Sequence, residues 1–276
     1  MKEISFMRKT GVILAVALSA GLAPTISTAQ EAPQITARDI VQKCDARYPG
    51  EDQQTRLKIT LRDRDANDKV NIYRRYWKDF KGRDGITEKM VLFTEYPPDA
   101  QGSAFMRWAY TGKNAEQWIY LPALKKTRRV SVRDPGDSFL GSDLTYADIS
   151  PRGLDEDDHT VLGAEEHDGQ KIINIKSVPR PGTLQLYSHV VSQYVMTNNW
   201  DDCHKQQIDY YDPKGELLKQ QSIKWQRIDD AWLWSEVNVH NVQTNHRSIF
   251  EVSEAKVNIG LSDDVFSERN LTRGGR

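Results

Sequence analysis

The stretch Arg56-Leu-Lys-Ile-Thr-Leu-Arg62 alternates polar and apolar side chains, so its two leucines and its isoleucine share one face. Alternation with a period of two is typical of a β-strand that buries one face against a core. A polar turn at residues 63–68 follows, and residues 70–78 then return with strand character and several aromatic side chains. The order strand, turn, strand predicts an antiparallel hairpin.

Strand-like runs of this kind fill most of the remaining chain, about thirteen in all, with turn residues between them. So many strands must curl or close to protect their edges. The pattern therefore predicts a mainly β protein, built on a large curved antiparallel sheet or an unclosed β-barrel.

One helix is expected near the N-terminus, where it would act as a lid over the open face of the sheet. Thr36 is a suitable N-cap, and a Pro-Gly pair at 49–50 ends the segment. The apolar stripe of this helix consists of Ile40, Val41 and Cys44.

The composition excludes several classes of protein. The chain has 276 residues, 38% of them hydrophobic, and a formal net charge of −1. That apolar content is too high for a disordered chain. The near-neutral charge argues against a partner whose phosphates must be neutralised, so we expect no nucleic acid partner.

The N-terminus has the pattern of a cleavable export signal at residues 1–29. Basic side chains precede an apolar run at 11–23, and small residues at 27–29 form a cleavage site. The run is too short to cross a bilayer as a helix. No cysteine lies at the cleavage site. We therefore expect a periplasmic protein without a lipid anchor, whose residues 30–276 form a single β domain.

The two cysteines, Cys44 and Cys203, both lie in the exported part of the chain. A disulfide persists in an oxidising compartment, and one that closes so long a loop would stabilise the fold strongly. The sequence leaves open whether the two side chains meet.

Motifs for catalysis or metal binding are absent. Ser138 and Ser142 lack the Gly-x-Ser-x-Gly frame of a nucleophile elbow. The run Asp63-x-Asp65-x-Asn67 resembles the start of a calcium loop but lacks its later glycine and glutamate. We predict that the protein is not an enzyme and that it has no catalytic residue, metal site or cofactor.

Two segments in the middle of the chain have no structural explanation from periodicity alone. Residues 133–158 form a long aperiodic stretch that ends in an acidic run at 155–158, which suits a lid or a partner contact. Before it, a strand ends at Pro122 and four basic residues follow closely. They are either a solvated edge or a basic rim for an anionic head group or an acidic partner.

These segments resemble a known family. The block Trp118-x-Tyr-x-Pro-x-Leu-Lys-Lys-x-Arg-Arg129, followed by Ser138-Phe-x-Gly-Ser-Asp143, resembles outer-membrane lipoprotein-sorting proteins of the LolA/LolB-like carrier superfamily. The Tyr96-Pro-Pro-Asp99 segment and the Tyr211-Asp-Pro-x-Gly215 hairpin look like the same family.

The resemblance implies an unclosed antiparallel β-barrel with a helical lid, whose hydrophobic cavity shields acyl chains during transit across the periplasm. It also implies work with an inner-membrane transporter of the resistance-nodulation-division (RND) type. The lipoprotein carrier itself lacks the Lys-Lys-x-Arg-Arg block, so a free lipid is as good a candidate cargo as a lipoprotein.

Three sets of candidate residues follow from the sequence. The candidate walls of the lipid cavity, or alternatively parts of the core, are Trp118, Tyr120 and Phe139. The candidate basic rim consists of Lys125, Lys126, Arg128 and Arg129. A gate or a structural turn is expected at Gly141 and Asp143.

The sequence thus predicts a carrier of lipid or lipoprotein acyl chains toward the outer membrane. The alternative is a non-catalytic interaction module that docks on an envelope transporter complex through the basic rim and the acidic run.

Overall fold

The computed structural model describes residues 35–130, 135–197 and 199–274. The expected signal peptide at residues 1–29 lies outside the described residues.

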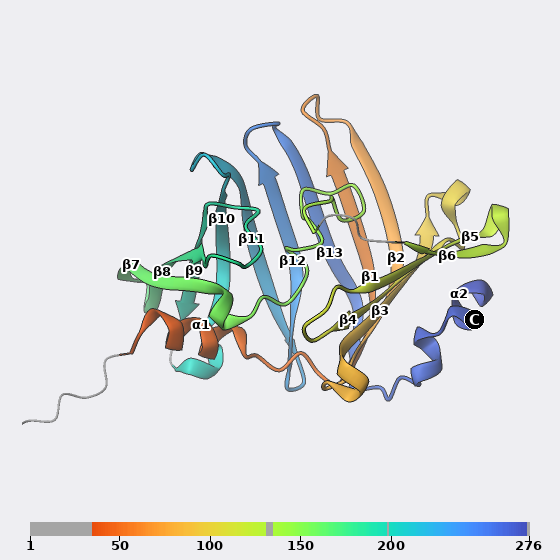
Figure 1. The fold of residues 1–276 in the computed structure, drawn as a ribbon, viewed down its shortest axis with the longest axis horizontal. Helices are drawn as coiled ribbons and strands as arrows, with labels where there is room; N and C mark the ends of the chain where they lie inside the picture. The colour runs from red at the N-terminus through yellow and green to blue at the C-terminus, as the bar shows by residue number, and fades with distance from the viewer. Residues whose placement is uncertain (1–34, 131–134, 198, 275–276) are drawn as a thin grey trace, which may run out of the picture. The chain divides into compact units, whose positions relative to one another are not determined.

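The described residues form one thirteen-stranded antiparallel sheet in the order β6-β5-β4-β3-β2-β1-β13-β12-β11-β10-β9-β8-β7 (Figure 1). The strands are β1 (Asp52–Arg62), β2 (Asp68–Asp79), β3 (Ile86–Tyr96), β4 (Ala104–Tyr110), β5 (Glu116–Leu121), β6 (Lys126–Val130), β7 (Asp157–His167), β8 (Gln170–Pro179), β9 (His189–Met196), β10 (His204–Tyr211), β11 (Leu217–Ile228), β12 (Ala231–Asn241) and β13 (His246–Val257). The edge strands β6 and β7 do not pair with each other, so the sheet is open, and the prediction of a mainly β protein with an unclosed sheet is confirmed.

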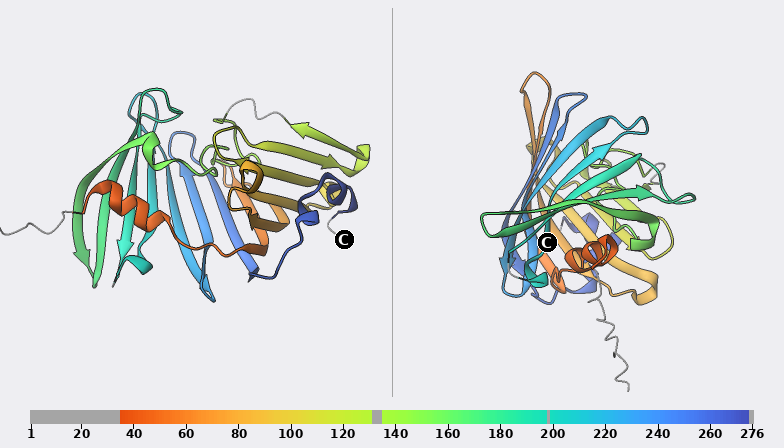
Figure 2. Two further views of the ribbon diagram at one scale, coloured as in Figure 1. Left: turned by 60° about the horizontal axis from the view of Figure 1, so that its bottom comes forward. Right: turned by 90° about the vertical axis from the view of Figure 1, so that its left-hand side faces the viewer.

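The chain builds this sheet as two meanders that meet in the middle. Strands β1 to β6 run outward to one edge, and β7 to β13 run inward from the other edge until β13 pairs with β1. Residues 131–156 therefore connect one edge of the sheet to the other. Figure 2 shows how strongly the sheet curves between β7 and β6.

The opening hairpin forms as the alternation predicts. Strand β1 pairs with β2 so that Leu57 lies opposite Tyr73 and Ile59 opposite Asn71. Leu57, Ile59 and Leu61 are buried on the inner side of the curve, which we call the concave face. The outer side is the convex face.

Helix α1 (Ala37–Asp45) lies on the concave face over the β7–β10 end of the sheet, the position expected of a lid (Figures 1 and 2). Thr36 and Asp39 form a reciprocal capping box, with the Asp39 backbone N donating to Thr36 Oγ1 at 3.2 Å. The buried stripe of the helix packs against Ile173, Ile175 and Tyr194. The helix ends before the Pro-Gly pair at 49–50.

A second helix, α2 (Glu268–Arg273), was not expected from the sequence. Phe266, just before the helix, and Leu271 within it pack against the convex side of the β2–β5 half of the sheet. Ser267 caps the helix and Gly274 ends it in the left-handed conformation. Among the described residues, neither helix has the length and apolar character needed to cross a membrane.

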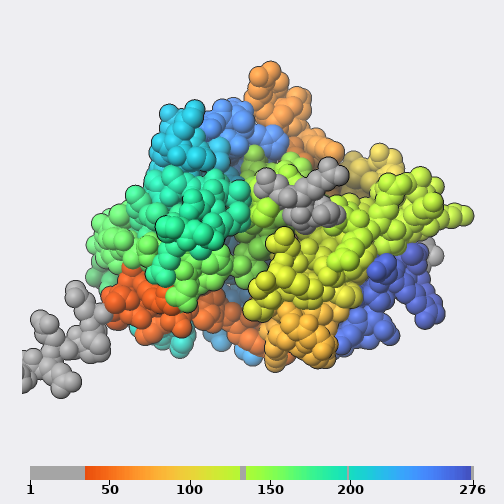
Figure 3. Space-filling model, in the orientation of Figure 1, coloured from red at the N-terminus to blue at the C-terminus, as the bar shows by residue number. Residues whose placement is uncertain are grey.

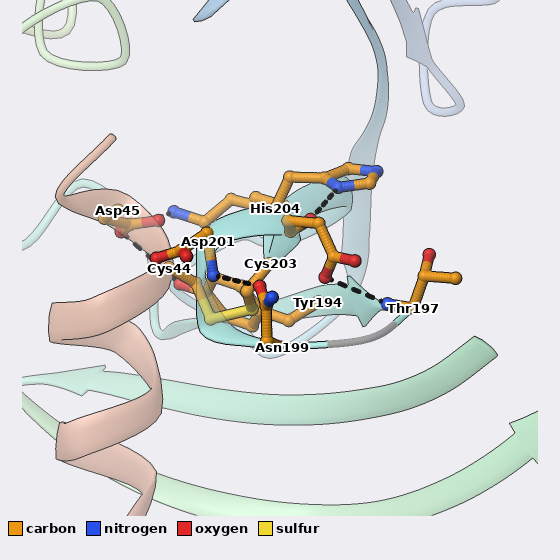
Figure 4. The surroundings of a disulfide bond; sticks show 10 residues. Cys44, Asp45, Tyr194, Thr197, Asn199, Asp201, Cys203 and His204 are labelled. Atoms are coloured by element: carbon orange, nitrogen blue, oxygen red, sulfur yellow. Dashed lines mark hydrogen bonds and ion pairs between the residues drawn. A yellow bond between two sulfur atoms is a disulfide. The ribbon is translucent and has the colours of Figure 1, made fainter. Parts of the chain in front are cut away.

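A disulfide joins Cys44 at the end of α1 to Cys203 at the start of β10 (Figure 4). Both residues are fully buried among the residues that α1 packs against. The bond spans 159 residues of sequence, so it links the lid to a strand formed much later in the chain.

Removing this bond should destabilise the fold without altering its strands. For a loop of this length, the loop-entropy relation gives a stabilisation of about 5 kcal/mol. We expect Cys44→Ser combined with Cys203→Ser to lower the free energy of unfolding in urea toward that extent. Reductant should destabilise the parent protein and leave the double variant unchanged. Equal stability of the oxidised and reduced parent would contradict this assignment.

Candidate functional site

The centre of the concave face is covered by part of the chain itself. Residues 135–153, the concave-face loop, place Phe139 and Leu144 on an apolar surface formed by β1, β3, β4, β12 and β13. Phe139 meets Phe105 edge-on, with ring centroids 6.0 Å apart, and Tyr146 meets Phe139 at 5.6 Å. The loop therefore occupies the apolar surface that an acyl chain would need.

A buried ion pair holds this loop to the sheet. Lys219 of β11 places its Nζ 2.6 Å from Asp148 Oδ2, and the two side chains are 3% and 2% exposed. The same Nζ donates to the backbone O of Asp143 at 2.6 Å. Tyr187 donates its hydroxyl to Asp148 Oδ1 at 3.0 Å. Burial, together with the facing Asp148 carboxylate, raises the pKa of Tyr187, so its hydroxyl remains a donor.

The expected gate residues, Gly141 and Asp143, lie in the part of the loop that is held to the sheet. Asp143 accepts hydrogen bonds from Ser248 Oγ at 2.6 Å and lies 2.7 Å from His246 Nδ1, both on β13. Gly141 has a φ of +79°, a conformation that glycine adopts without strain. These contacts make Gly141 and Asp143 a turn that is fixed to the sheet in this state.

Beside the loop, the concave face contains a cleft of about 850 Å³. This volume is in the range of small-molecule sites. The cleft lies between the β3–β5 side and the β8–β10 side, where Figure 3 shows the surface hollowed between the yellow and turquoise segments. Its walls include Arg107, Gln117, Tyr146, Leu186, Val190 and Ile208. A smaller cavity of about 390 Å³ shares part of this wall and reaches α1.

Charged side chains in the cleft are mostly paired. Arg152 lies 2.6 Å from Asp157, and Lys205 lies 3.1 Å from Asp45. Burial acts to lower the pKa of Lys205, but Tyr194 and Asp45 outweigh it, so the pKa is raised. The wall is thus a mixture of apolar surface and compensated charge.

The three candidate cavity residues separate in the structure. Phe139, a residue of the concave-face loop, packs against the concave face, whereas Trp118 and Tyr120 point to the convex face. Trp118 is buried there among residues of β3, β4 and the C-terminal segment, and Tyr120 packs against the same cluster. Trp118 and Tyr120 do not line the cleft.

The basic residues lie at the open edge of the sheet. Lys125 is in the turn before β6, and the other three belong to this edge strand. Arg128 lies opposite Ile119, whereas Arg129 lies opposite Trp118 on the other face and pairs with Glu116 at 2.7 Å. The four charges are therefore divided between two faces. We call Lys125, Lys126, Arg128 and Arg129 the basic edge.

The acidic run at 155–158 is largely neutralised by arginines of the same chain. Asp155 pairs with Arg38 of α1 at 2.7 Å, and Asp158 pairs with Arg180 at 2.7 Å. Arg152 pairs with the two acidic residues between them. The run fixes the start of β7 and offers little free negative charge.

The serines considered as nucleophiles have structural partners. Ser138 donates its hydroxyl to the backbone O of Ser142 at 2.5 Å, and Ser142 donates to the O of Phe139 at 2.7 Å. Within residues 35–130, 135–197 and 199–274, no cluster of three or more histidine, cysteine or acidic side chains could hold a metal ion.

An open antiparallel sheet with a helix and a loop on its concave face defines the class of the LolA/LolB-like proteins. A DUF1329 family protein from Desulfovibrio piger has this fold, with 25% identity and a TM-score of 0.73 over 85% of this chain and 97% of that one. A domain from Vibrio parahaemolyticus assigned as an outer membrane lipoprotein-sorting protein is 24% identical, with a TM-score of 0.72 over 86% of this chain and 98% of that one. A LolA superfamily protein from Nitrosomonas europaea is 17% identical, with a TM-score of 0.61 over 86% of this chain and 100% of that one.

The sequence comparison adds the family. A family model described as “Uncharacterized protein” matches residues 87–273, more than half of the chain, and the chain belongs to that family. No curated protein matches the sequence. The expected resemblance to the LolA/LolB-like superfamily is confirmed at the level of the fold.

The sequence analysis missed the charged residues of the concave face. Arg107 shares the inward-facing positions of β4 with Phe105 and Ala109, and Lys219 shares those of β11 with Gln221. A charge at an inward position of an otherwise apolar strand was the available signal, because such a charge needs a buried partner.

The buried pair predicts a measurable change in the loop. Lys219→Met leaves Asp148 buried without its cation, which typically costs about 3–5 kcal/mol. We expect the free energy of unfolding to fall to that extent and hydrogen exchange at residues 138–149 to accelerate. Lys219→Met combined with Asp148→Leu should recover part of the loss, because neither charge then remains. A single variant as stable as the parent would contradict the role of this pair.

Proposed function

We propose that the protein is a periplasmic carrier that shields lipid or lipoprotein acyl chains on its concave face during transport toward the outer membrane. The observation that supports this most directly is the cleft of about 850 Å³, which adjoins an apolar surface covered by the chain's own loop. The LolA-type fold of the structural neighbours points in the same direction.

The free energy of burying an acyl chain is large enough for a carrier that catalyses no reaction. Each buried methylene contributes about 0.8 kcal/mol, so a chain of sixteen carbons gains roughly 12 kcal/mol before the costs of association. That gain comes from apolar surface alone. The proposal needs no catalytic group and no cofactor.

Release of the cargo requires two states with different affinities. We infer that the concave-face loop is the moving part, because its apolar side chains and an acyl chain would compete for the same surface. The buried anchor at Lys219 favours the covered state.

The cellular setting belongs to the same proposal. The export signal at residues 1–29 and the lack of a cysteine at its cleavage site favour an unanchored periplasmic protein. An RND-type inner-membrane transporter is the proposed donor or acceptor of the cargo, on the basis of the family resemblance.

Lipid uptake tests the carrier function. Protein purified from the cell envelope should carry lipid detectable by mass spectrometry, and emptied protein should bind a fluorescent fatty acid. Ile208→Asp places a charge in the wall of the cleft and should weaken that binding at least about tenfold. The matched control is Leu162→Asp, since Leu162 is 56% exposed on the edge strand β7. Protein that neither carries lipid nor binds the probe would refute the carrier function.

The second candidate is an interaction module that docks on an envelope transporter complex. The basic edge favours it, because Lys125, Lys126 and Arg128 form no ion pair with any residue in the described part of the chain. The alternative explanation for the same charges is that they protect an open strand edge from pairing with another chain.

Charge reversal distinguishes docking on a transporter from protection of the strand edge. Lys126→Glu with Arg128→Glu should abolish recovery of an RND-type transporter with the protein from solubilised envelopes if the basic edge docks there. Binding of the fluorescent fatty acid should remain unchanged. The control is Lys69→Glu with Lys214→Glu, two exposed lysines in other turns and strand ends. Undiminished recovery of the transporter would leave the basic edge with a protective role only.

A further inference from the structure

A group of polar side chains points inward from β2 to β5, next to the cleft. Arg107 and Gln117 are cross-strand partners that line the cleft, and they are 4% and 1% exposed. Glu88 of β3 and Arg75 of β2 lie on the same concave face. Polar groups this deeply buried normally have their hydrogen bonds satisfied.

Two donors of this group have no acceptor within the part of the chain that the structure describes. Arg107 donates from Nη1 to Glu88 Oε1 at 2.9 Å and from Nη2 to Ser150 Oγ at 2.7 Å, but its Nε is unpartnered. Gln117 Nε2 is also buried and unpartnered. An unsatisfied buried donor destabilises the fold. A bound group that supplies the missing acceptor would remove this cost.

The charges of this group also favour a bound anion, because its cations outnumber its carboxylates. Glu88 is the one carboxylate within ion-pair distance of Arg107 among the described residues, and Arg75 has no such partner. The other oxygen of Glu88 already accepts from Trp77 Nε1 at 2.7 Å. Burial lowers the pKa of Arg75 to about 10, which still leaves it charged at neutral pH. Two cations therefore share one anion on this part of the concave face.

We propose that Arg107 and Gln117 bind the anionic head group of an amphiphile, a carboxylate or a phosphate, whose acyl chain lies along the cleft. The inference rests on the carrier function proposed above and adds the class of head group. Arg107 and Gln117 supply adjacent N–H donors, and a guanidinium matches the geometry of both anions. The chain would then follow the apolar wall at Leu186, Val190 and Ile208.

The concave-face loop supplies the acceptor for Arg107 Nη2 in this structure. Ser150 Oγ accepts from Arg107 Nη2 and in turn donates to the backbone O of Tyr146 at 2.6 Å. A bound head group replaces Ser150 at Arg107, so its arrival and the withdrawal of this part of the loop are the same event.

The test uses three fluorescent probes with one acyl chain: the fatty acid, the corresponding alcohol and the alkyl phosphate. The parent protein should bind the acid and the phosphate at least about tenfold more tightly than the alcohol, because hydrogen bonds to a charged group are the stronger ones. Gln117→Glu keeps the size of the side chain and introduces a negative charge. It should remove this preference, so that the acid and the phosphate no longer bind more tightly than the alcohol.

Two further variants complete the design. Gln101→Glu makes the same change of charge at an exposed turn and should leave all three affinities unaltered. Arg107→Lys keeps a cation beside Glu88 but loses the planar guanidinium with its paired N–H donors. It should therefore weaken binding of the acid more than binding of the alcohol. If Gln117→Glu does not fold, as judged by circular dichroism, Arg107→Lys decides the question.

The possible results are distinct. Equal affinity of the parent for the acid and the alcohol overturns the head-group site while the carrier function stands. A parallel loss for both probes in Gln117→Glu also overturns it. Inorganic phosphate that binds as tightly as the alkyl phosphate identifies a site for small anions and overturns the amphiphile. Failure of the parent to bind any probe refutes the carrier function, and the head-group site with it.

Discussion

The contact between Lys219 and the concave-face loop is the interaction on which the inner surface of this protein depends. An ammonium group buried to this degree is stable only while Asp148 and the backbone O of Asp143 remain in place. By holding those two positions, Lys219 also fixes the apolar side chains between and before them against the sheet. A polar contact at one point therefore decides whether an apolar surface several residues away is covered.

The rest of the chain covers parts of both faces of the open sheet. Helix α1 and the concave-face loop cover the inside, and the C-terminal segment covers the outside of the β2–β5 half. The inner cover leaves space at the cleft. The outer cover is aromatic and packed, which is why Trp118 belongs to the core of the molecule and not to a cavity.

Much of the fold was predictable from local patterns. The alternation at residues 56–62 and the Thr36 cap each act over a few residues, and the observed hairpin and helix agree with them. The position of a strand in the sheet depends on pairings distant in sequence, such as β1 with β13, which local patterns do not contain. The face to which Trp118 points follows from that placement. The partners of Lys219 lie in an aperiodic loop, so no spacing rule could identify them.

The connection between β6 and β7 has a topological consequence. The sheet is open where these strands fail to pair, yet the chain itself runs from one of them to the other across the concave side. The described part of this connection, residues 135–156, thus ties the interior of the concave face to both halves of the chain. A molecule held on that face would lie between the sheet and a segment of the same chain, and not beneath a free terminus.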